Sequence, residues 1–146
     1  QLGQAKNGSH HHQLKIYMRL RRHLSQVHDL LVKREEIVVE ALRIEETVPN
    51  RRALIMGSLR FWNGSRLEFT ETLVEQGVIL IKTDYAYHYQ DANARLIFRY
   101  DNAPHHRQVS TFPHHKHTTA GVTEAQPPHL VDVLREVDEF LYRHTG

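Results

Sequence analysis

Apolar residues recur at spacings of three and four in two segments, one near each end of the chain. The first segment runs from Leu14 to Arg34, and the second follows Pro127-Pro128, a pair suited to a helix start. The residues on these stripes are Tyr17, Leu20, Leu24, Val27 and Leu31 in the first segment and Leu130, Val133, Leu134, Val137 and Leu141 in the second. This spacing predicts two helices, each with one apolar side facing a core.

Between the two helices the pattern changes to the alternation that is typical of strands. Five runs from Ile37 onward show it. In the first three, the residues that share a parity are Val38, Leu42 and Ile44, then Ala53, Ile55, Leu59 and Phe61, then Leu67, Phe69 and Leu73. The fourth and fifth runs are residues 78–89 and 94–101. The runs are joined by short turns, of which Asn63-Gly64 is the strongest hairpin signal. Short connections predict that neighbouring strands pair antiparallel as a meander.

After Asp101 the periodicity stops, and residues 102–126 are predicted to form one long, histidine-rich loop. A loop of this length in a compact domain is either disordered or functional. The prediction is an α+β domain over residues 14–146: an N-terminal helix, a five-stranded antiparallel meander, the loop and a C-terminal helix, with both helices on one face of the sheet. Residues 1–13, which include His10, His11 and His12, are expected to be disordered or a purification-tag remnant.

The composition fits a globular protein of one domain. The 146 residues are 40% hydrophobic and 25% charged, without a cysteine, so disulfides and thiolate metal sites are excluded. No apolar run approaches the roughly 20 residues that span a bilayer, and the first 13 residues lack the apolar segment of a signal peptide. The cytoplasm is therefore the expected location, with no membrane partner. The net charge of +2 argues only weakly for nucleic acid.

Histidine is the unusual component, with 13 copies in the chain. Six of them fall within thirty residues: His88, His105, His106, His114, His115 and His117. Histidine is the side chain that gains or loses a proton near neutral pH without a large shift in its pKa. The cluster therefore predicts where the chemistry of this protein takes place.

Alternation divides the residues before the loop between two faces of the sheet. Tyr85, Tyr87 and Tyr89 share one face, and His88 lies on the other. The tyrosines either cover the core or form a stacking platform for unpaired bases. In the fifth strand Arg99 and Asp101 should face away from the core, because a buried arginine is costly. They are either a surface ion pair or a phosphate clamp and a histidine orienter.

These residue types suit acid–base cleavage of RNA. One imidazole takes the proton of a ribose 2′-hydroxyl and a second protonates the leaving 5′-oxygen, which needs no cofactor. The candidates for base, acid and orienter are His106, His115, His117 and Asp101. The candidates for binding the substrate are Arg99, Lys116, Arg107, His88, Tyr87 and Tyr89.

The same side chains allow three other interpretations. His105, His106, His115 and His117, together with Asp101, could ligate a metal, although their spacing matches no familiar zinc motif. The histidines could simply bind loop carbonyls. The basic and aromatic surface could also bind RNA or a protein without cleaving it. A chelator and an analysis of reaction products would distinguish these alternatives.

The first helix carries an excess of basic residues: Lys15, Arg19, Arg21, Arg22, Lys33 and Arg34, against one acid, Asp29. They form either a solvated surface or a ridge that binds phosphates or an acidic partner.

Three stretches of this sequence resemble the TumE-like toxin family. They are Tyr87-His88-Tyr89-Gln90-Asp91, then residues 96–106 (LIFRYDNAPHH), then residues 111–117 (TFPHHKH). The resemblance extends from about Leu14 to the last helix and is most specific between residues 84 and 117. It departs from the family pattern at Asp91-Ala92-Asn93-Ala94, where a glycine-containing turn is expected, and at residues 1–13, which match nothing.

The resemblance implies a type II toxin from a bacterium or archaeon, acting on RNA and silenced by a cognate helix-turn-helix antitoxin. The expected partners are therefore this antitoxin and an RNA substrate, and the sequence leaves open whether the chain forms a homo-oligomer. It also leaves open the RNA cleaved, the roles of the individual histidines and the dependence on metal.

Overall fold

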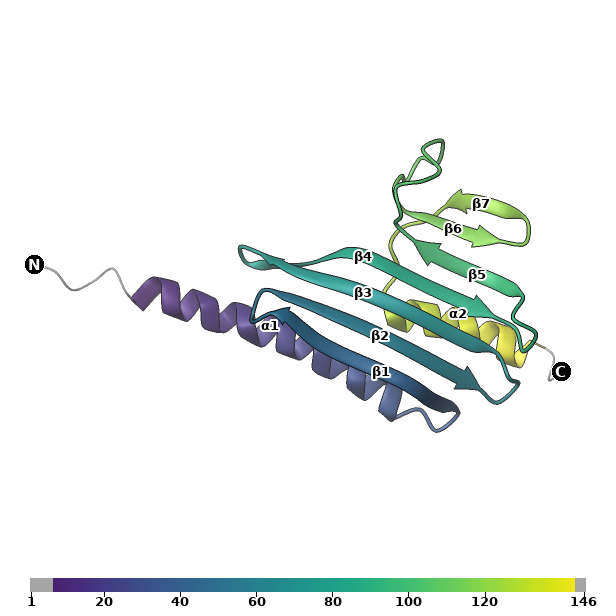
Figure 1. Cartoon of the computed structure of the whole chain (residues 1–146), viewed down its shortest axis with the longest axis horizontal. Coiled ribbons are helices and arrows are strands. Elements are labelled where there is room, and N and C mark those ends of the chain that lie inside the picture. Colours follow the sequence, from purple (N-terminus) through teal and green to yellow (C-terminus); the bar gives the residue numbers. More distant parts are fainter. Residues whose placement is uncertain (1–6, 144–146) are drawn as a thin grey trace, which may run out of the picture.

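The computed structural model describes the backbone of residues 7–143 and the side chains of residues 19–143 (Figure 1). Its elements are α1 (Asn7–Val32), β1 (Ile37–Val48), β2 (Arg52–Phe61), β3 (Arg66–Gln76), β4 (Ile79–Gln90), β5 (Leu96–Asp101), β6 (His115–Thr118), β7 (Gly121–Glu124) and α2 (Leu130–Tyr142). The first helix begins at Asn7, not at Leu14 as predicted. Residues 1–13 were predicted to be disordered or a tag remnant. Residues 1–6 lie outside the described part of the chain, and residues 7–13 belong to the helix α1.

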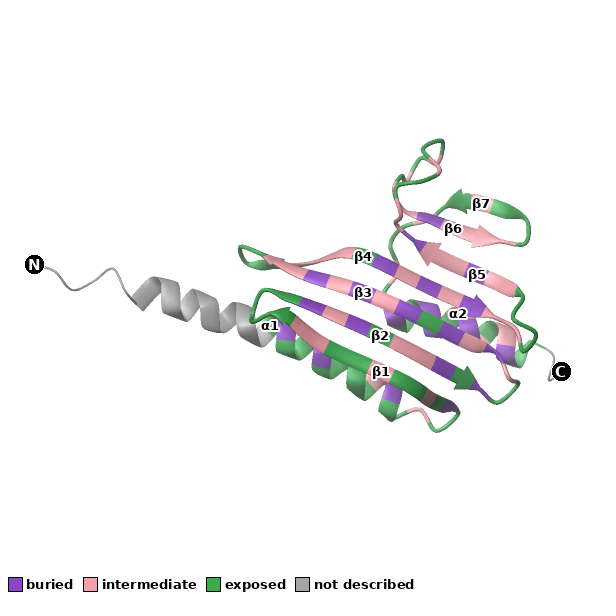
Figure 2. Ribbon diagram, in the orientation of Figure 1, coloured by how far each residue is buried: buried purple, intermediate pink, exposed green. Residues whose placement is uncertain are grey.

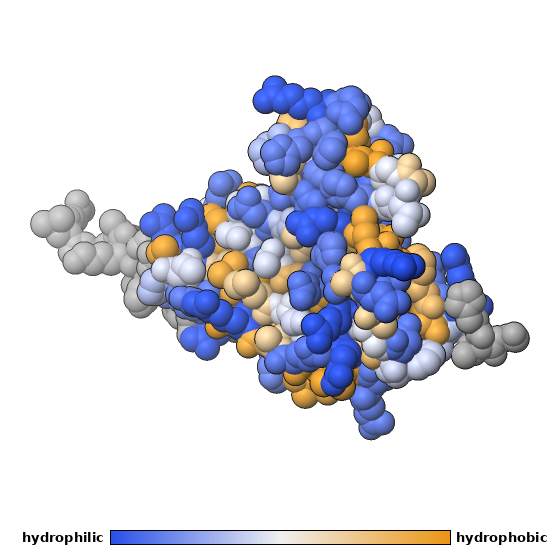
Figure 3. Space-filling view, turned by 45° about the vertical axis from the view of Figure 1, so that its right-hand side comes forward, coloured by the Kyte–Doolittle hydropathy of each residue, from blue (hydrophilic) through white to orange (hydrophobic). Residues whose placement is uncertain are grey.

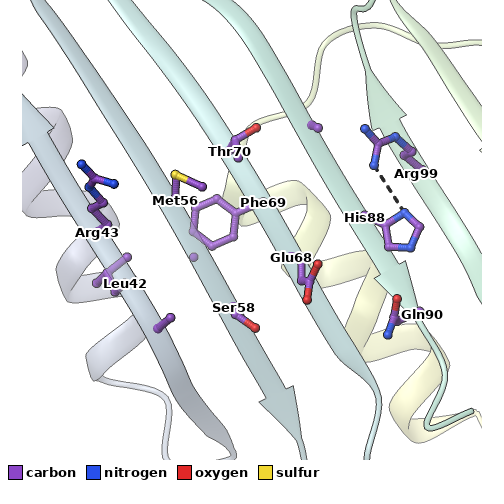
Figure 4. A pocket seen from close by; sticks show the side chains of 13 residues that line it. Leu42, Arg43, Met56, Ser58, Glu68, Phe69, Thr70, His88, Gln90 and Arg99 are labelled. Atoms are coloured by element: carbon purple, nitrogen blue, oxygen red, sulfur yellow. Dashed lines mark hydrogen bonds between the residues drawn. The ribbon is translucent and has the colours of Figure 1, made fainter. Parts of the chain in front are cut away.

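The strands form one sheet in the order β1-β2-β3-β4-β5-β6-β7, and each strand pairs antiparallel with the next. Both helices lie behind this sheet in Figures 1 and 4. The predicted α+β class, the meander and the packing of both helices on one face are confirmed. We call the face covered by the helices the inner face and the opposite one the outer face.

The number of strands was predicted wrongly, because the sheet has seven strands instead of five. The two additional strands, β6 and β7, lie within residues 102–126, where a loop was expected. Their sequences, His-Lys-His-Thr and Gly-Val-Thr-Glu, lack the apolar alternation by which strands are recognised. They are held by backbone pairing: β6 pairs with β5, with Asp101 opposite His115 and Arg99 opposite His117, and β7 pairs with β6.

The inner face and the apolar stripes of the two helices form the core. Leu20, Leu24, Val27 and Leu31 of α1 are buried there, as predicted. Tyr85, Tyr87 and Tyr89 of β4 also point into the core, and Tyr87 and Tyr89 are completely buried. The alternative of a stacking platform for bases therefore does not apply in this fold, since none of these three rings is open to a base.

Two of the β-bulges change the parity of strands in ways that the sequence does not indicate. In β1 the register shifts between Val39 and Ala41, so Val38 is 51% exposed on the outer face whereas Leu42 packs against the core. In β4 a shift before Asp84 turns Lys82 to the inner face. A bulge adds one residue to one strand only, which reverses the alternation beyond it.

The two faces differ in what covers them. Figure 2 shows buried and less buried residues alternating along β2, β3 and β4, as expected where one face packs on helices and the other does not. On the surface seen in Figure 3, apolar side chains form small patches between polar ones. Neither helix of the described residues is both long and apolar enough to cross a bilayer.

Candidate active site

Asp101, at the end of β5, is the centre of a polar cluster on the outer face. Its Oδ1 lies 3.0 Å from His115 Nε2, and its Oδ2 lies 3.3 Å from His117 Nε2. Arg99 Nε donates to Oδ2 and the backbone N–H of Ala103 donates to Oδ1, both at 3.0 Å. One carboxylate, only 4% exposed, therefore joins two histidines, an arginine and the start of the following loop.

Strand register explains why these side chains meet. Residues 99 and 101 of β5 face outward because Phe98 and Tyr100 face the core. The pairing of β5 with β6 then sets His117 opposite Arg99 and His115 opposite Asp101 on that face. Opposite residues on one face of an antiparallel pair have Cβ atoms about 5 Å apart, within hydrogen-bonding reach for these side chains.

Asp101 is ionised despite its burial. Burial alone would raise the pKa of this carboxyl, but the N–H of Ala103, the guanidinium of Arg99 and the charge of His115 outweigh it and lower the pKa. Asp101 is therefore a fixed negative charge and a hydrogen-bond acceptor at neutral pH.

His115 has an acceptor at each ring nitrogen. Its Nδ1 donates to the carbonyl oxygen of Pro113 at 2.8 Å, and its Nε2 faces Asp101. A carbonyl and an ionised carboxylate can only accept, so each binds a protonated ring nitrogen. At 2% exposure the ring is closed to a substrate. Its position fits a residue that holds the site together.

His117 differs from His115 in accessibility. Its side chain is 27% exposed. Burial, together with the positive charges of His115 and Arg99, lowers its pKa despite the raising effect of Asp101. The ring is therefore neutral at pH 7. With the proton on Nε2 directed at Asp101, Nδ1 keeps a lone pair, as a general base requires.

His106 completes the cluster from the loop that follows β5. Its ring centroid lies 5.0 Å from that of His115 and 5.3 Å from that of His117. Its backbone has a φ of 60°, in the left-handed region that non-glycine residues rarely adopt. Such conformations concentrate at functional sites, where the surrounding structure enforces them.

Arg99 links the cluster to β4. Its NH1 lies 3.5 Å from His88 Nδ1, and Figure 4 shows the two side chains directed toward each other across neighbouring strands. One N–H of the guanidinium is used by Asp101 and another is directed at His88. An arginine has five N–H donors in a planar fork, so the remaining ones can bind a phosphate oxygen.

Lys116 does not join this site, contrary to the prediction. It lies between His115 and His117 in β6, and alternation directs it to the inner face. There its ammonium is paired with Glu136 of α2 and lies 4.9 Å from the ring centroid of Tyr100. The prediction that Lys116 holds a phosphate beside the histidines is corrected, because the sheet separates the two.

The other predicted site residues are divided between the cluster and its surroundings. Brought together are Asp101, His106, His115, His117, Arg99 and His88. Kept apart are Tyr87 and Tyr89 in the core, and His105 and Arg107, which are exposed in the loop. Arg107 lies over the ring of Phe112, with 5.9 Å between its guanidinium carbon and the ring centroid.

Two supports of the site were missed by sequence reasoning. The first is the contact between Tyr85 and His114, the residue that precedes His115. Tyr85 OH lies 2.8 Å from His114 Nδ1, and the two rings stack with centroids 5.8 Å apart. Burial and then the charge of Asp101 raise the pKa of Tyr85 to about 12, so this hydroxyl stays protonated and can donate. The other support is the backbone of Ala103 and Pro113, for which the sequence offers no signal.

The histidine cluster is also the candidate metal centre among the described residues. One ring nitrogen from each of His106, His115 and His117 lies within 4.8 Å of the others, and His105 is not part of this group. Three imidazoles are a common ligand set for zinc. His115, however, has no lone pair to offer unless it gives up its hydrogen bond to Pro113 or to Asp101.

Comparison with known proteins connects the chain to one family of toxins. The family model described as "Toxin TumE" matches residues 28–141, well over half of the chain. The matched segment contains the whole sheet, nearly all of α2 and every residue of the cluster. No curated protein and no solved structure shows significant similarity.

Proposed function

This chain belongs to the TumE toxin family, and we propose that it is the toxin of a type II toxin–antitoxin system that acts as a metal-independent endoribonuclease. The observation that carries the proposal is the pair formed by His115 and His117 on one carboxylate. The first is buried and holds the carboxylate, whereas the second is an accessible imidazole whose lowered pKa leaves it neutral at pH 7. Neighbouring histidines with different environments are what acid–base catalysis near pH 7 requires.

In this mechanism His117 is the general base and His106 the general acid. His117 Nδ1 takes the proton of a ribose 2′-hydroxyl, and the 2′-oxygen attacks the adjacent phosphorus. The bond from phosphorus to the 5′-oxygen breaks as His106 delivers a proton to that oxygen. The products are a 2′,3′-cyclic phosphate and a 5′-hydroxyl, and each positioned group contributes about 10²–10⁴-fold to the rate.

The other members of the cluster position and stabilise. Asp101 fixes the tautomer of His117 and offsets the charge that it acquires. Arg99 presents its remaining N–H groups to the phosphate oxygens, whose negative charge grows in the transition state. His115 holds Asp101 in place from below. The scheme uses only the side chains of the chain and no cofactor.

Incubation of the purified protein with a defined single-stranded RNA in EDTA tests the proposal. The expected result is cleavage at full rate, with cyclic phosphate and 5′-hydroxyl ends detected by end mapping. Binding without new ends would instead indicate a toxin or regulator that occupies RNA or a protein without cleaving it. Cleavage that leaves a 5′-phosphate would contradict this mechanism.

A metal-dependent hydrolase is the second candidate, supported by the approach of three imidazole nitrogens within 4.8 Å. Zinc bound by His106, His115 and His117 would supply a hydroxide nucleophile. The hydrogen bond from His115 to Pro113 argues against it, because a ligating nitrogen must lose its proton. Isothermal titration of the protein with zinc distinguishes the two. Micromolar affinity that disappears in His106→Ala, together with cleavage abolished by EDTA and restored by zinc, would favour the metal.

The antitoxin is the expected protein partner of a toxin of this family, and we place it on the basic surface of α1. Arg19, Arg21 and Arg22 are exposed on this helix, and Arg21 Nε lies 3.7 Å from Glu46. Complementary charge speeds association and makes it salt-dependent. Reversal of charge at Arg21 and Arg22 should slow association with a helix-turn-helix antitoxin and weaken its salt dependence. Unchanged association at low salt would mean that the ridge is only solvated.

A further inference from the structure

A groove of about 680 Å³ lies on the outer face and extends from β1 to β5 (Figure 4). Its volume is within the range of roughly 300–1,000 Å³ that small-molecule sites occupy. Both helices pack on the opposite face, and in Figure 1 no described element lies in front of this face of β1 to β5. The groove is therefore a preformed surface hollow, and His88 and Arg99 of the candidate active site line one part of it.

The shape of the groove follows from small side chains. Ser58 of β2, Thr70 of β3 and Ala86 of β4 face outward at its floor, with Met56 among the apolar lining. Most of the larger apolar residues on these strands point into the core, which leaves short side chains at the outer positions of three neighbouring strands. A floor that is flat and largely apolar suits the face of a planar ring.

The groove is continuous with the candidate active site through one row of paired residues. Ser58 pairs with Glu68, Glu68 with His88, and His88 with Arg99. Arg99 in turn pairs with His117. Adjacent strands are about 4.8 Å apart, so Glu68 and His117, three strands apart, are separated by about 14 Å along this row. A nucleic-acid strand whose phosphate lies at Arg99 therefore has its neighbouring base over the groove.

The polar groups that line the groove have unused hydrogen-bonding capacity. Neither Glu68 nor Gln90 makes a side-chain hydrogen bond or an ion pair within the described part of the chain. An ionised glutamate only accepts, whereas a glutamine amide donates and accepts. The base edge that matches a carboxylate is that of guanine, whose N1–H and N2–H are two adjacent donors. Uracil presents one N–H flanked by two carbonyls and fits poorly.

The far end of the groove carries positive charge. Arg60 Nε and Arg66 NH2 lie 3.0 and 3.1 Å from the two carboxylate oxygens of Glu40, so two guanidiniums share one acid. Arg66 pairs across the strands with Gln90, which lines the groove. Two guanidiniums against one carboxylate leave a net positive charge about one residue beyond the groove. The phosphates of a bound nucleic acid would lie there.

From these observations we infer a nucleobase subsite: the outer-face groove binds a guanine of single-stranded RNA next to the cleaved phosphate. Glu68 accepts from the guanine edge, and the guanidiniums of Arg60 and Arg66 bind the strand beyond it. The inference rests on the proposed ribonuclease function and adds a residue that determines specificity. Glu68 lies outside the catalytic cluster and contacts no reacting atom.

The subsite is tested with 2′-O-methyl hexanucleotides that differ in one central base, because a 2′-O-methyl group removes the nucleophile and separates binding from cleavage. Ser58→Phe fills the groove from an outward position, and Ser25→Phe places the same side chain on the exposed side of α1. We expect Ser58→Phe to weaken binding of the guanine oligonucleotide at least tenfold and Ser25→Phe to leave it unchanged. Equal affinity in both variants overturns the subsite.

Glu68→Gln tests how the base is recognised without changing the volume of the groove. It should reduce the preference for guanine over uracil about tenfold, since a well-formed bidentate contact discriminates by roughly that factor or more. Glu139→Gln, on the exposed side of α2, is the control and should keep the preference of the wild type. A preference that Glu68→Gln leaves intact contradicts the role of Glu68.

The outcomes separate the subsite from the ribonuclease function. If the wild type cleaves RNA but the Ser58→Phe variant binds and cleaves as well as the wild type, the subsite is wrong and the function stands. If the wild type binds guanine oligonucleotides through the groove but produces no new RNA ends, the ribonuclease function fails and the subsite stands.

Discussion

The two faces of the sheet are built from alternate residues of the same strands, and yet they use their polar side chains in opposite ways. In β6, Lys116 points inward and pairs with Glu136, whereas His115 and His117 point outward to Asp101. On the inner face the polar network is closed by helices. On the outer face it ends in groups with free lone pairs and donors.

The inner network shows what a closed arrangement achieves. Glu71 accepts from Tyr87 OH at 3.0 Å and lies 3.4 Å from His23 Nε2, while Lys82 donates to Tyr87 OH at 2.7 Å and to the carbonyl of Pro128 at 2.6 Å. Burial would raise the pKa of Glu71, but the hydrogen bond with His23 and the charge of Lys82 outweigh it and lower the pKa. This network ties α1 and the segment before α2 to the sheet.

The comparison teaches that burial of a charge does not by itself mark an active site. Glu71 and Asp101 are both buried carboxylates with lowered pKa values, and the partner of Glu71, His23, is itself 31% exposed. Only Asp101, however, brings two histidines and an arginine together on the outer face. The side chains of His117 and Arg99 are 27% and 38% exposed. We therefore expect substitutions on the outer face to reduce activity and those on the inner face to reduce stability.

The largest expected effect follows Asp101→Asn. The amide keeps the size of the carboxylate but loses its charge, so the tautomer of His117 is no longer fixed and His115 loses its charged partner. Single-turnover cleavage should fall about 10²–10⁴-fold. Asp84→Asn, at an exposed position of β4, should cleave at the rate of the wild type. Equal rates in both variants would remove Asp101 from the mechanism.

On the inner face, Tyr87→Phe should leave catalysis intact and reduce stability. The substitution deprives buried Glu71 and Lys82 of one hydrogen-bond partner each, at a cost of about 1–3 kcal/mol. Urea unfolding measures this change, with Ser25→Ala, which removes an exposed hydroxyl from α1, as the control. A loss of cleavage at unchanged stability would mean that the inner network takes part in the chemistry.

The pH profile should follow the lowered pKa of His117. The neutral ring is the base, so activity is lost as the pH falls through the pKa of this residue, which lies below the usual value of about 6.5. Below it the rate should decline about tenfold per pH unit. Circular dichroism over the same range separates this limb from unfolding, because the lowered pKa of Asp101 means that its stabilising contribution is also lost as the pH falls through that pKa. An acidic limb above pH 7 would contradict this assignment.

The smallest effect is expected for a single phosphate contact. Arg99→Ala should weaken binding of a non-cleavable RNA several-fold and lower the slope of log K against log salt by about 0.7, the value for one contact to a single strand. Lys33→Ala, at an exposed position just after α1, should leave the slope unchanged. If the two variants behave alike, Arg99 serves only as the partner of Asp101.

Regular parts of the fold could be predicted from the sequence because their pattern is local. The stripes of α1 and α2 and the alternation of β4 and β5 each reflect a buried side. The strands β6 and β7 could not be recognised in this way, because their residues are mostly polar and their pairing depends on β5. The bulges of β1 and β4 also depend on a partner strand, so the outward position of Val38 carries no local signal.

The candidate site was predicted more accurately in its composition than in its geometry. Asp101, His106, His115 and His117 meet as predicted, since histidines and an acid were concentrated in one segment. Lys116 was expected beside the histidines in a loop, although the alternation His-Lys-His would have separated it from them had β6 been recognised as a strand. The roles that we propose for His115 and His117 rest on burial and on the carbonyl of Pro113, which no sequence motif encodes.

The most direct test compares two neighbours in β6. His117→Ala and Lys116→Ala change adjacent residues that face opposite sides of the sheet, and both are assayed on the same RNA in EDTA. The account predicts that His117→Ala lowers cleavage about 10²–10⁴-fold and that Lys116→Ala, corrected for any unfolded fraction, stays within a few-fold of the wild type. A larger loss in Lys116→Ala than in His117→Ala would contradict the claim that the chemistry resides on the outer face.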